Sequence, residues 1–181
     1  MSRPVCYIGV AFFNRPSFPT QWALILSGSP LFEGPGYGST VAETVNGVCT
    51  PWVSINGSPA SFNPLGHFLG IISVGQIPTS LQNAHALISS ANQASAEDRT
   101  FVQGADDIPW GSEKYVVLAL LRLHEGRCLT QRLPRLGRGS LAHFIGGRIR
   151  DLLRVSYNPG SGVFPVVTLE SGQVSFGQPR R

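Results

Sequence analysis

Charged residues are scarce in this chain. Asp, Glu, Lys and Arg make up 13% of the 181 residues, about half the usual share. Glycine and proline are abundant, with 21 and 14 copies, but they follow no period that would indicate a collagen-like or low-complexity segment. Because 42% of the residues are hydrophobic, the chain can fill the core of one domain and is short for two. We therefore expect one loop-rich globular domain over residues 1–181.

Cysteine and long apolar runs are also scarce. The three cysteines are widely spaced and form no CxxC pair, which argues against a disulfide framework and a zinc site. The apolar run over residues 5–13 is short and lacks the small-residue cleavage site of a signal peptide, so we interpret it as a buried first strand. No run reaches membrane-spanning length. We therefore expect a cytoplasmic protein with no membrane span.

Paired metal ligands are missing as well. No His, Asp, Glu or Cys recurs three or four residues from another in a way that would place two ligands on one helix face. We therefore expect no metal and no other cofactor.

The positive charge is concentrated in residues 122–154, where eight arginines outnumber two acidic residues and leave a net charge of +6. A nucleic-acid surface or an acidic-membrane surface is one interpretation. However, the arginines lack the interleaved aromatics of single-strand binders and fit no helix-turn-helix or zinc-finger spacing. We favour a solvated helix face with a basic loop and expect no nucleic-acid partner. The oligomeric state is left open.

The chain is organised around the stretch from Trp110 to Gly126. Between Tyr115 and Leu123 every residue except one arginine is apolar, so a helix here has no broad face for water and should be buried. Ser112 is a suitable N-cap, and Gly126 is placed to end the helix. This pattern predicts a buried central helix.

The N-terminal half, residues 5–75, reads mainly as strands. Residues 14–19 contain two prolines and should interrupt pairing, while the glycine-rich residues 28–38 should form a flexible pocket lip. Asn46-Gly47 is a strong hairpin signal. The predicted strands are 5–13, 21–27, the hairpin arms 40–45 and 48–55, and 67–74.

The C-terminal half reads mainly as helices over residues 78–157. Pro78 should open one helix, with Thr79 near its cap, and Ser140 should cap another that ends at Tyr157. Residues 163–169 and 173–176 should form a terminal hairpin within 163–176. The expected fold is α+β: a mostly antiparallel sheet packed against a buried central helix and two further helices.

Two motifs carry a family resemblance. The strand that opens Gln21-Trp-Ala-Leu and the later Trp110-Gly-Ser-Glu-Lys-Tyr-Val resemble a group of small fungal proteins of unknown function. More remotely, residues 5–126 are similar to the permuted NlpC/P60 and lecithin-retinol acyltransferase branch of the papain-like fold. In that branch, a strand with a His-Trp-Ala-type motif supplies the catalytic base, and an Asn-Cys-Gln-type motif at the start of the central helix supplies the nucleophile.

The resemblance implies an active centre at Gln21 and Ser112, which replace the family's histidine and cysteine. Gln cannot take a proton near neutral pH, and an unassisted serine is a poor nucleophile, so the thiol-hydrolase machinery is missing. His67 begins a predicted strand and could reach this site, although we favour a structural, hydrogen-bonded strand histidine. Glu43 could act as a general acid if its strand turns it inward.

Aromatic residues are plentiful around this predicted centre. Most should be core, but Phe32, Tyr37 and Phe62 lie in loop-like sequence and could form the mouth of an apolar pocket. The candidate ligand-binding residues are Phe13, Trp22, Tyr37, Trp52, Trp110 and Tyr115.

Three functions remain open. The first is an enzyme of fungal secondary metabolism without a covalent intermediate, of the cyclase, isomerase or pericyclase type. It would fold an apolar small-molecule substrate in the aromatic pocket and stabilise charge with neutral donors such as Gln21 and Ser112. The second is a catalytically degenerate papain-like domain that binds a ligand or partner. The third is a serine hydrolase built on Ser112 and His67.

Overall fold

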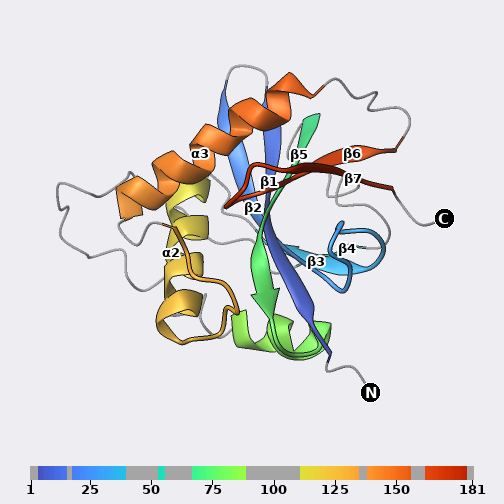
Figure 1. Ribbon diagram of the computed structural model, residues 1–181, viewed down its shortest axis with the longest axis vertical. Helices are drawn as coiled ribbons and strands as arrows, with labels where there is room; N and C mark the ends of the chain where they lie inside the picture. The colour runs from blue at the N-terminus through green and yellow to red at the C-terminus, as the bar shows by residue number, and fades with distance from the viewer. Residues whose placement is uncertain are drawn as a thin grey trace.

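A seven-stranded sheet with helices against one face forms the fold (Figure 1). The computed structural model describes residues 4–15, 18–39, 53–55, 67–88, 111–134, 138–155 and 162–178. The strands are β1 (Cys6–Arg15), β2 (Phe18–Ser27), β3 (Gly36–Ser39), β4 (Val53–Ile55), β5 (His67–Ile77), β6 (Phe164–Thr168) and β7 (Val174–Gly177). The labelled helices are α2 (Ser112–Glu125) and α3 (Arg138–Arg154), and residues 81–88 are also helical.

The strand order is β4-β3-β2-β1-β5-β6-β7. All neighbouring pairs are antiparallel except β5 and β6, which run parallel. The parallel pair is possible because a long segment that includes α2 and α3 separates β5 from β6, and parallel strands require such a long crossover. The predicted α+β class with a mostly antiparallel sheet is confirmed.

The central strand β1 is buried on both faces. Ile8, Val10 and Phe12 belong to the core on the helix side, whereas Ala11 and Phe13 belong to a second core on the opposite side. A strand covered on both faces has no polar alternation, which explains the unbroken apolar run in the sequence.

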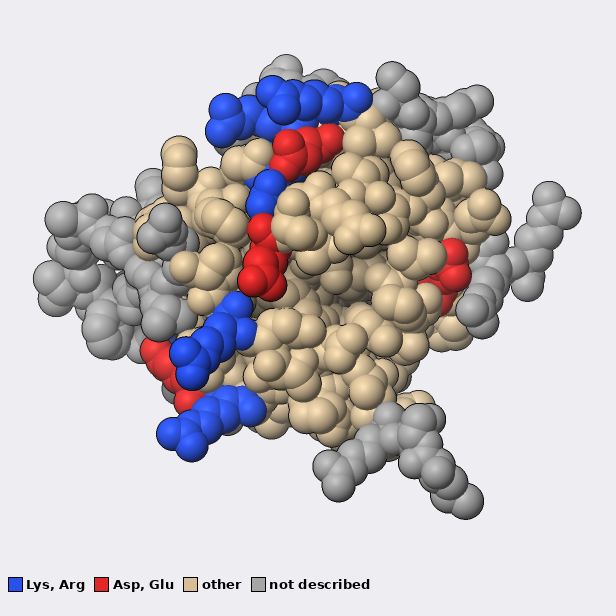
Figure 2. Space-filling view, viewed as in Figure 1, with Lys and Arg blue, Asp and Glu red and all other residues tan. Residues whose placement is uncertain are grey.

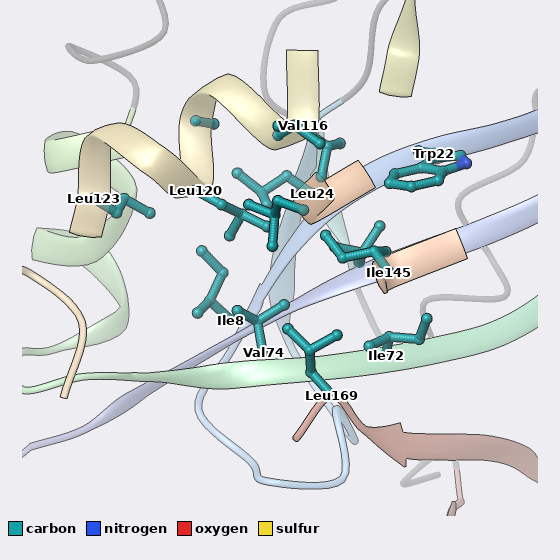
Figure 3. Packing of buried hydrophobic residues seen from close by; sticks show 14 of the residues in the cluster. Ile8, Trp22, Leu24, Ile72, Val74, Val116, Leu120, Leu123, Ile145 and Leu169 are labelled. Atoms are coloured by element: carbon teal, nitrogen blue, oxygen red, sulfur yellow. The ribbon is translucent and has the colours of Figure 1, made fainter. Parts of the chain in front are cut away.

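The larger core lies between the sheet and the helices (Figure 3). In Figure 3, Val116 and Leu120 of α2 point toward Leu24 of β2, and Ile145 of α3 also points into the core. Helix α2 is buried along nearly its whole length because it packs against both the sheet and α3. The predicted buried central helix is therefore confirmed.

A second core fills the other face of the sheet and depends on one glycine. Phe32 lies in the β2–β3 loop with a left-handed φ of 56° and is completely buried. A Cβ atom on Gly9 would lie 2.7 Å from the Phe32 ring and 2.7 Å from Ile71 Cγ2. The missing side chain at Gly9 therefore makes room for Phe32. Phe32 had been expected at a pocket mouth, and the prediction fails because the loop folds its ring into this core.

The pairing of β1 with β2 extends into residues 14–19, further than predicted, but it is irregular there, and residues 16–17 lie outside the described residues. Strand β1 continues to Arg15, β2 begins at Phe18, and these two residues pair. Between this pair and the Phe13–Gln21 pair, β2 has one residue more than β1, which is a β-bulge. Pro19 lies in this bulge, a kind of position at which strands tolerate proline.

The glycine-rich segment 28–38 also contains a strand that was not predicted. Residues Gly36–Ser39 form β3 and pair with β2. A Cβ atom on Gly36 would overlap the carbonyl oxygen of Leu26, so glycine allows the two backbones to approach. Within the predicted hairpin, residues 53–55 form β4 and pair with β3, whereas the turn at 46–47 and the arm 40–45 lie outside the described residues.

Helix boundaries differ from the predictions by a few residues. Helix α3 begins at Arg138 instead of after Ser140. At the start of the helix over residues 81–88, Ser80 takes the capping role that was expected of Thr79, because the Ser80 Oγ accepts a hydrogen bond from the Asn83 N–H. The N-cap of α2 is Gly111, and Ser112 is the first helical residue. At its other end α2 stops at Gly126 as predicted, but Arg127 adopts the left-handed conformation there.

The Gly9–Phe32 contact gives a test of the second core. Gly9→Ala should destabilise the protein by about 1–3 kcal/mol, because the added methyl overpacks a filled core. Gly28→Ala is the matched control, since nothing lies within 4 Å of its added Cβ. Urea unfolding of both variants measures the difference. Equal stability of the two variants would show that Phe32 does not require the space above Gly9.

Candidate functional site

Ser112, the predicted substitute for a nucleophile, has a structural role. Its Oγ accepts a hydrogen bond from the backbone N–H of Trp22 at 3.1 Å, and the residue is only 2% exposed. The hydroxyl therefore joins the start of α2 to β2. A buried hydroxyl engaged in this way is poorly placed to attack a substrate.

Gln21 lies beside this contact along the chain, but its side chain is on the other face of the sheet. Gln21 pairs with Phe13 of β1, which belongs to the second core, whereas Trp22 pairs with Phe12 and faces the helices. Because successive side chains alternate between faces, the sheet separates the Gln21 side chain from Ser112. The structure brings the two residues together through the backbone at Trp22 and not through a shared pocket.

His67 lies at the exposed start of β5, opposite Asn14. Strand β1 lies between β5 and the β2 strand that Ser112 contacts. Two strand spacings amount to about 10 Å, which is too far for direct proton transfer. The structure therefore does not bring His67 and Ser112 together.

The predicted ligand-binding aromatics that are described pack against other protein groups. Phe13 and Tyr115 are completely buried, and Trp22 is 4% exposed and stacks edge-on against Phe12. Tyr115 shares a 2.7 Å hydrogen bond with Ser39. Tyr37 belongs to β3, not to a loop, and stacks on His85 with ring centroids 4.1 Å apart. The remaining candidates, Glu43, Trp52 and Trp110, lie outside the described residues.

A cleft of about 330 Å³, lined by both polar and apolar residues, opens on the sheet face opposite the helices. Its floor comes from β1, β5, β6 and β7, and its walls come from the β2–β3 loop, the β6–β7 turn and residues 128–134, which we call the strap. None of the predicted site residues that the structure describes lines it. Its polar lining residues are Tyr7, Ser73, Gln76, Gln131, Arg132, Thr168, Glu170 and Ser175.

Hydroxyl groups from four neighbouring strands line the floor of the cleft. Ser73 of β5 lies in register with Thr168 of β6, and Ser175 of β7 lies opposite Val166. Tyr7 of β1 completes this set, which we call the hydroxyl row. Neighbouring strands are about 4.8 Å apart, so the row presents closely spaced donors and acceptors. Across the described part of the chain, none of these hydroxyls has a hydrogen-bond partner.

The strap forms a fixed wall because a single residue of β5 holds it. The Thr130 backbone N–H and hydroxyl both donate to the Gln76 carbonyl oxygen, at 2.9 and 3.2 Å. The Gln76 N–H in turn donates to Gln131 Oε1 at 2.8 Å. A Cβ atom on Gly75 would lie 2.5 Å from that same oxygen, so glycine is needed for the strap to approach β5. These contacts hold the next residue, Arg132, beside the cleft.

The opposite wall is held by α3. The Arg148 guanidinium donates to the carbonyl oxygens of Leu169 and Glu170, at 2.9 and 2.8 Å, and pairs with Asp151 at 3.2 Å. This arginine of the basic segment therefore anchors the β6–β7 turn. On the face shown in Figure 2, basic and acidic side chains alternate along one band, and most of the remaining described surface is uncharged.

Burial changes the acidity of two groups outside the cleft. Desolvation raises the pKa of the Cys6 thiol to about 11, although a hydrogen bond from the Ser27 backbone partly lowers it. The thiol therefore stays protonated and unreactive at neutral pH. Burial also raises the pKa of Glu113 above its ordinary value of 4.5, and this effect outweighs the favourable position of a carboxylate in the first turn of α2.

The described residues contain neither a metal-binding cluster nor a helix that could cross a membrane. No group of three or more His, Cys, Asp or Glu side chains there is arranged to hold a metal ion. Nor does any helix in those parts of the chain combine the length and hydrophobicity that a membrane crossing requires.

Comparisons with known proteins leave the family open. No family model, no curated protein and no solved structure matches the chain. The resemblance to the permuted NlpC/P60 branch therefore stays a prediction.

The cleft leaves little signal in the amino-acid sequence. Ser73 and Thr168 are ordinary hydroxyl residues at the ends of apolar segments, and they meet only because β5 and β6 pair in parallel. Segments so far apart in sequence contain no local sign of this pairing. The available signal was strand alternation, which places each hydroxyl on one face of its own strand.

The role of Ser112 can be tested by Ser112→Ala. The variant should lose about 1–3 kcal/mol of stability, because the Trp22 N–H loses its buried acceptor. Ser171→Ala is the control: its hydroxyl accepts an exposed hydrogen bond from Gln173, so the change should stay within about 0.5 kcal/mol. Denaturant unfolding measures both. An equally small effect at Ser112 would contradict the proposed link between α2 and β2.

The raised pKa of Glu113 predicts a pH dependence. A carboxyl group whose folded pKa is raised favours the protonated folded state, so the wild type loses stability as pH rises through that pKa. Glu113→Gln lacks this titration. The stability of the wild type relative to the variant should therefore fall between acidic and neutral pH in parallel urea titrations. A difference that rises over the same range would show that helix-end electrostatics outweigh burial.

Proposed function

We propose that this protein is a binding domain for a small polar molecule, which it holds in the cleft between the hydroxyl row and the strap. The observation that carries the proposal is the set of free hydroxyls at Tyr7, Ser73, Thr168 and Ser175, which share one cleft. Ligand sites typically place a few convergent polar groups on a largely preformed surface. The fixed strap and turn supply that preformed shape.

Binding is favoured over covalent catalysis by the surroundings of two side chains with nucleophilic chemistry, the predicted Ser112 and the thiol of Cys6. Ser112 is buried against the Trp22 backbone, and β1 separates it from His67. The Cys6 thiol is buried with a raised pKa. A nucleophile needs both access and an adjacent base. Neither the Ser112 hydroxyl nor the Cys6 thiol has both.

A polar ligand is favoured over an apolar one by the same geometry. Phe13, Trp22 and Tyr115, which were expected to wall an apolar pocket, are packed into the two cores. An apolar ligand in the cleft would leave the hydroxyl row without hydrogen bonds, which costs free energy. The cyclase or isomerase hypothesis therefore loses three of the aromatic side chains that were predicted to bind its substrate. The cytoplasmic location stays a prediction.

The test is a thermal-shift and calorimetric screen of the intact protein against three probe sets: neutral polyols, polar amino acids, and the apolar probes indole and geraniol. A polar probe should stabilise the protein, and Ser73→Ala with Thr168→Val should weaken its binding roughly tenfold through the lost hydrogen bonds. Thr79→Val is the matched control, because this threonine lies outside the cleft. It should bind the probe as the wild type does.

Two outcomes would overturn the proposal. The first is stabilisation of the protein by apolar probes alone, with their binding unchanged by Thr168→Val. That result would favour the enzyme with an apolar substrate over the polar binding domain. The second is a screen in which no polar probe binds to protein that unfolds cooperatively.

A further inference from the structure

The charges at the rim of the cleft indicate the class of ligand. Arg132 on the strap and Glu170 on the β6–β7 turn both line the cleft, yet they form no ion pair with each other. In the part of the chain that the structure describes, neither side chain has any hydrogen-bond or ion-pair partner. The cleft therefore presents one free positive and one free negative group to the same volume.

Both charged residues are attached to anchored backbone. The strap is bound to Gln76 by the residues immediately before Arg132. The turn is held at the Glu170 carbonyl by the Arg148 guanidinium, which leaves the Glu170 carboxylate unpaired. Anchoring holds the backbone of both walls in place, and the two charged side chains are not paired with each other in the structure. A preorganised site of this kind loses less entropy on binding.

Charge complementarity then selects among small polar molecules. A guanidinium binds a carboxylate through two parallel N–H···O bonds, and a carboxylate side chain accepts hydrogen bonds from an ammonium group. The cleft volume of about 330 Å³ lies at the lower end of the usual range for small-molecule sites, about 300–1,000 Å³. This is room for a compact molecule that carries both charges.

We propose that the cleft binds a free α-amino acid with a polar side chain. Arg132 binds its carboxylate, Glu170 binds its ammonium group, and the hydroxyl row around Ser73 and Thr168 binds its side chain. This inference rests on the proposed function, since it names the ligand class of the same cleft. A neutral polyol would use the hydroxyl row but would leave both rim charges unpaired.

The experiment uses isothermal titration calorimetry with four probes: L-glutamine, N-acetyl-L-glutamine, L-glutamine amide and glucose. L-Glutamine should bind, and blocking either charged group should weaken binding about tenfold. Arg132→Gln should weaken L-glutamine binding and abolish the preference over the amide. Glu170→Gln should weaken it and abolish the preference over the N-acetyl form. Glu125→Gln and Arg150→Gln, exposed charges outside the cleft, should change nothing.

The outcomes separate this inference from the proposed function. If glucose binds, depends on Thr168, and ignores both rim substitutions, the amino-acid assignment fails while the polar binding domain stands. If blocked and free glutamine bind equally, the assignment fails in the same way. If no probe binds and the polar screen is also negative, both fail. The assignment is supported if Arg132→Gln abolishes only the preference over the amide and Glu170→Gln abolishes only the preference over the N-acetyl form. Both variants must also show unchanged unfolding curves.

Discussion

The double burial of β1 is the constraint on which the rest of the structure depends. One face of this strand packs under α2 and α3, and the other forms a second core closed by Phe32. Such packing leaves no tolerance for register error, because a shift by one residue would exchange the two cores. The completely buried Phe32 and the missing side chain at Gly9 fix that register from the side opposite the helices.

The cleft follows from the same arrangement. The β2–β3 loop carries Phe32 into the second core and continues beneath β7, where Glu33 accepts a hydrogen bond from the Gln178 N–H at 2.9 Å. The second core ends where the side chains of β5, β6 and β7 change from apolar to hydroxyl. Beyond that boundary the sheet presents the hydroxyl row, and the strap and the β6–β7 turn form the walls. The apolar part of the face supplies rigidity, and the polar part lines the cleft that we propose as the ligand site.

The helix side has a different role. Ser112, Tyr115 and Trp22 resemble site residues by their chemistry, but they join α2 to β2 and β3 through buried hydrogen bonds and ring packing. Arg148 likewise uses its charge on main-chain carbonyls of the β6–β7 turn. Several polar groups that are conspicuous in the sequence therefore stabilise the scaffold, while plain serines and threonines line the cleft.

Sequence by itself determined the elements whose signals are local. The continuous apolar stretch of α2, the buried strands β1, β2 and β5, and the terminal hairpin could be predicted because burial and turn chemistry leave periodic marks within a few residues. The end of α2 at Gly126 was predicted for the same reason. The start of β2 near Pro19 was missed, since a bulge accommodates the proline. The start of α2 was also misplaced, since Ser112 makes a long-range hydrogen bond to Trp22 instead of capping its own helix.

Only the tertiary structure decided which side chains meet. The parallel pairing of β5 with β6 joins segments almost one hundred residues apart, and it places Ser73 beside Thr168. Alternation along β2 assigns Gln21 and Trp22 to opposite faces, so two neighbours in sequence belong to different cores or surfaces. Arg132 and Glu170 share a cleft because separate hydrogen bonds hold the strap and the turn in place. Local sequence carries no record of such contacts, because their free energy depends on groups that only folding brings together.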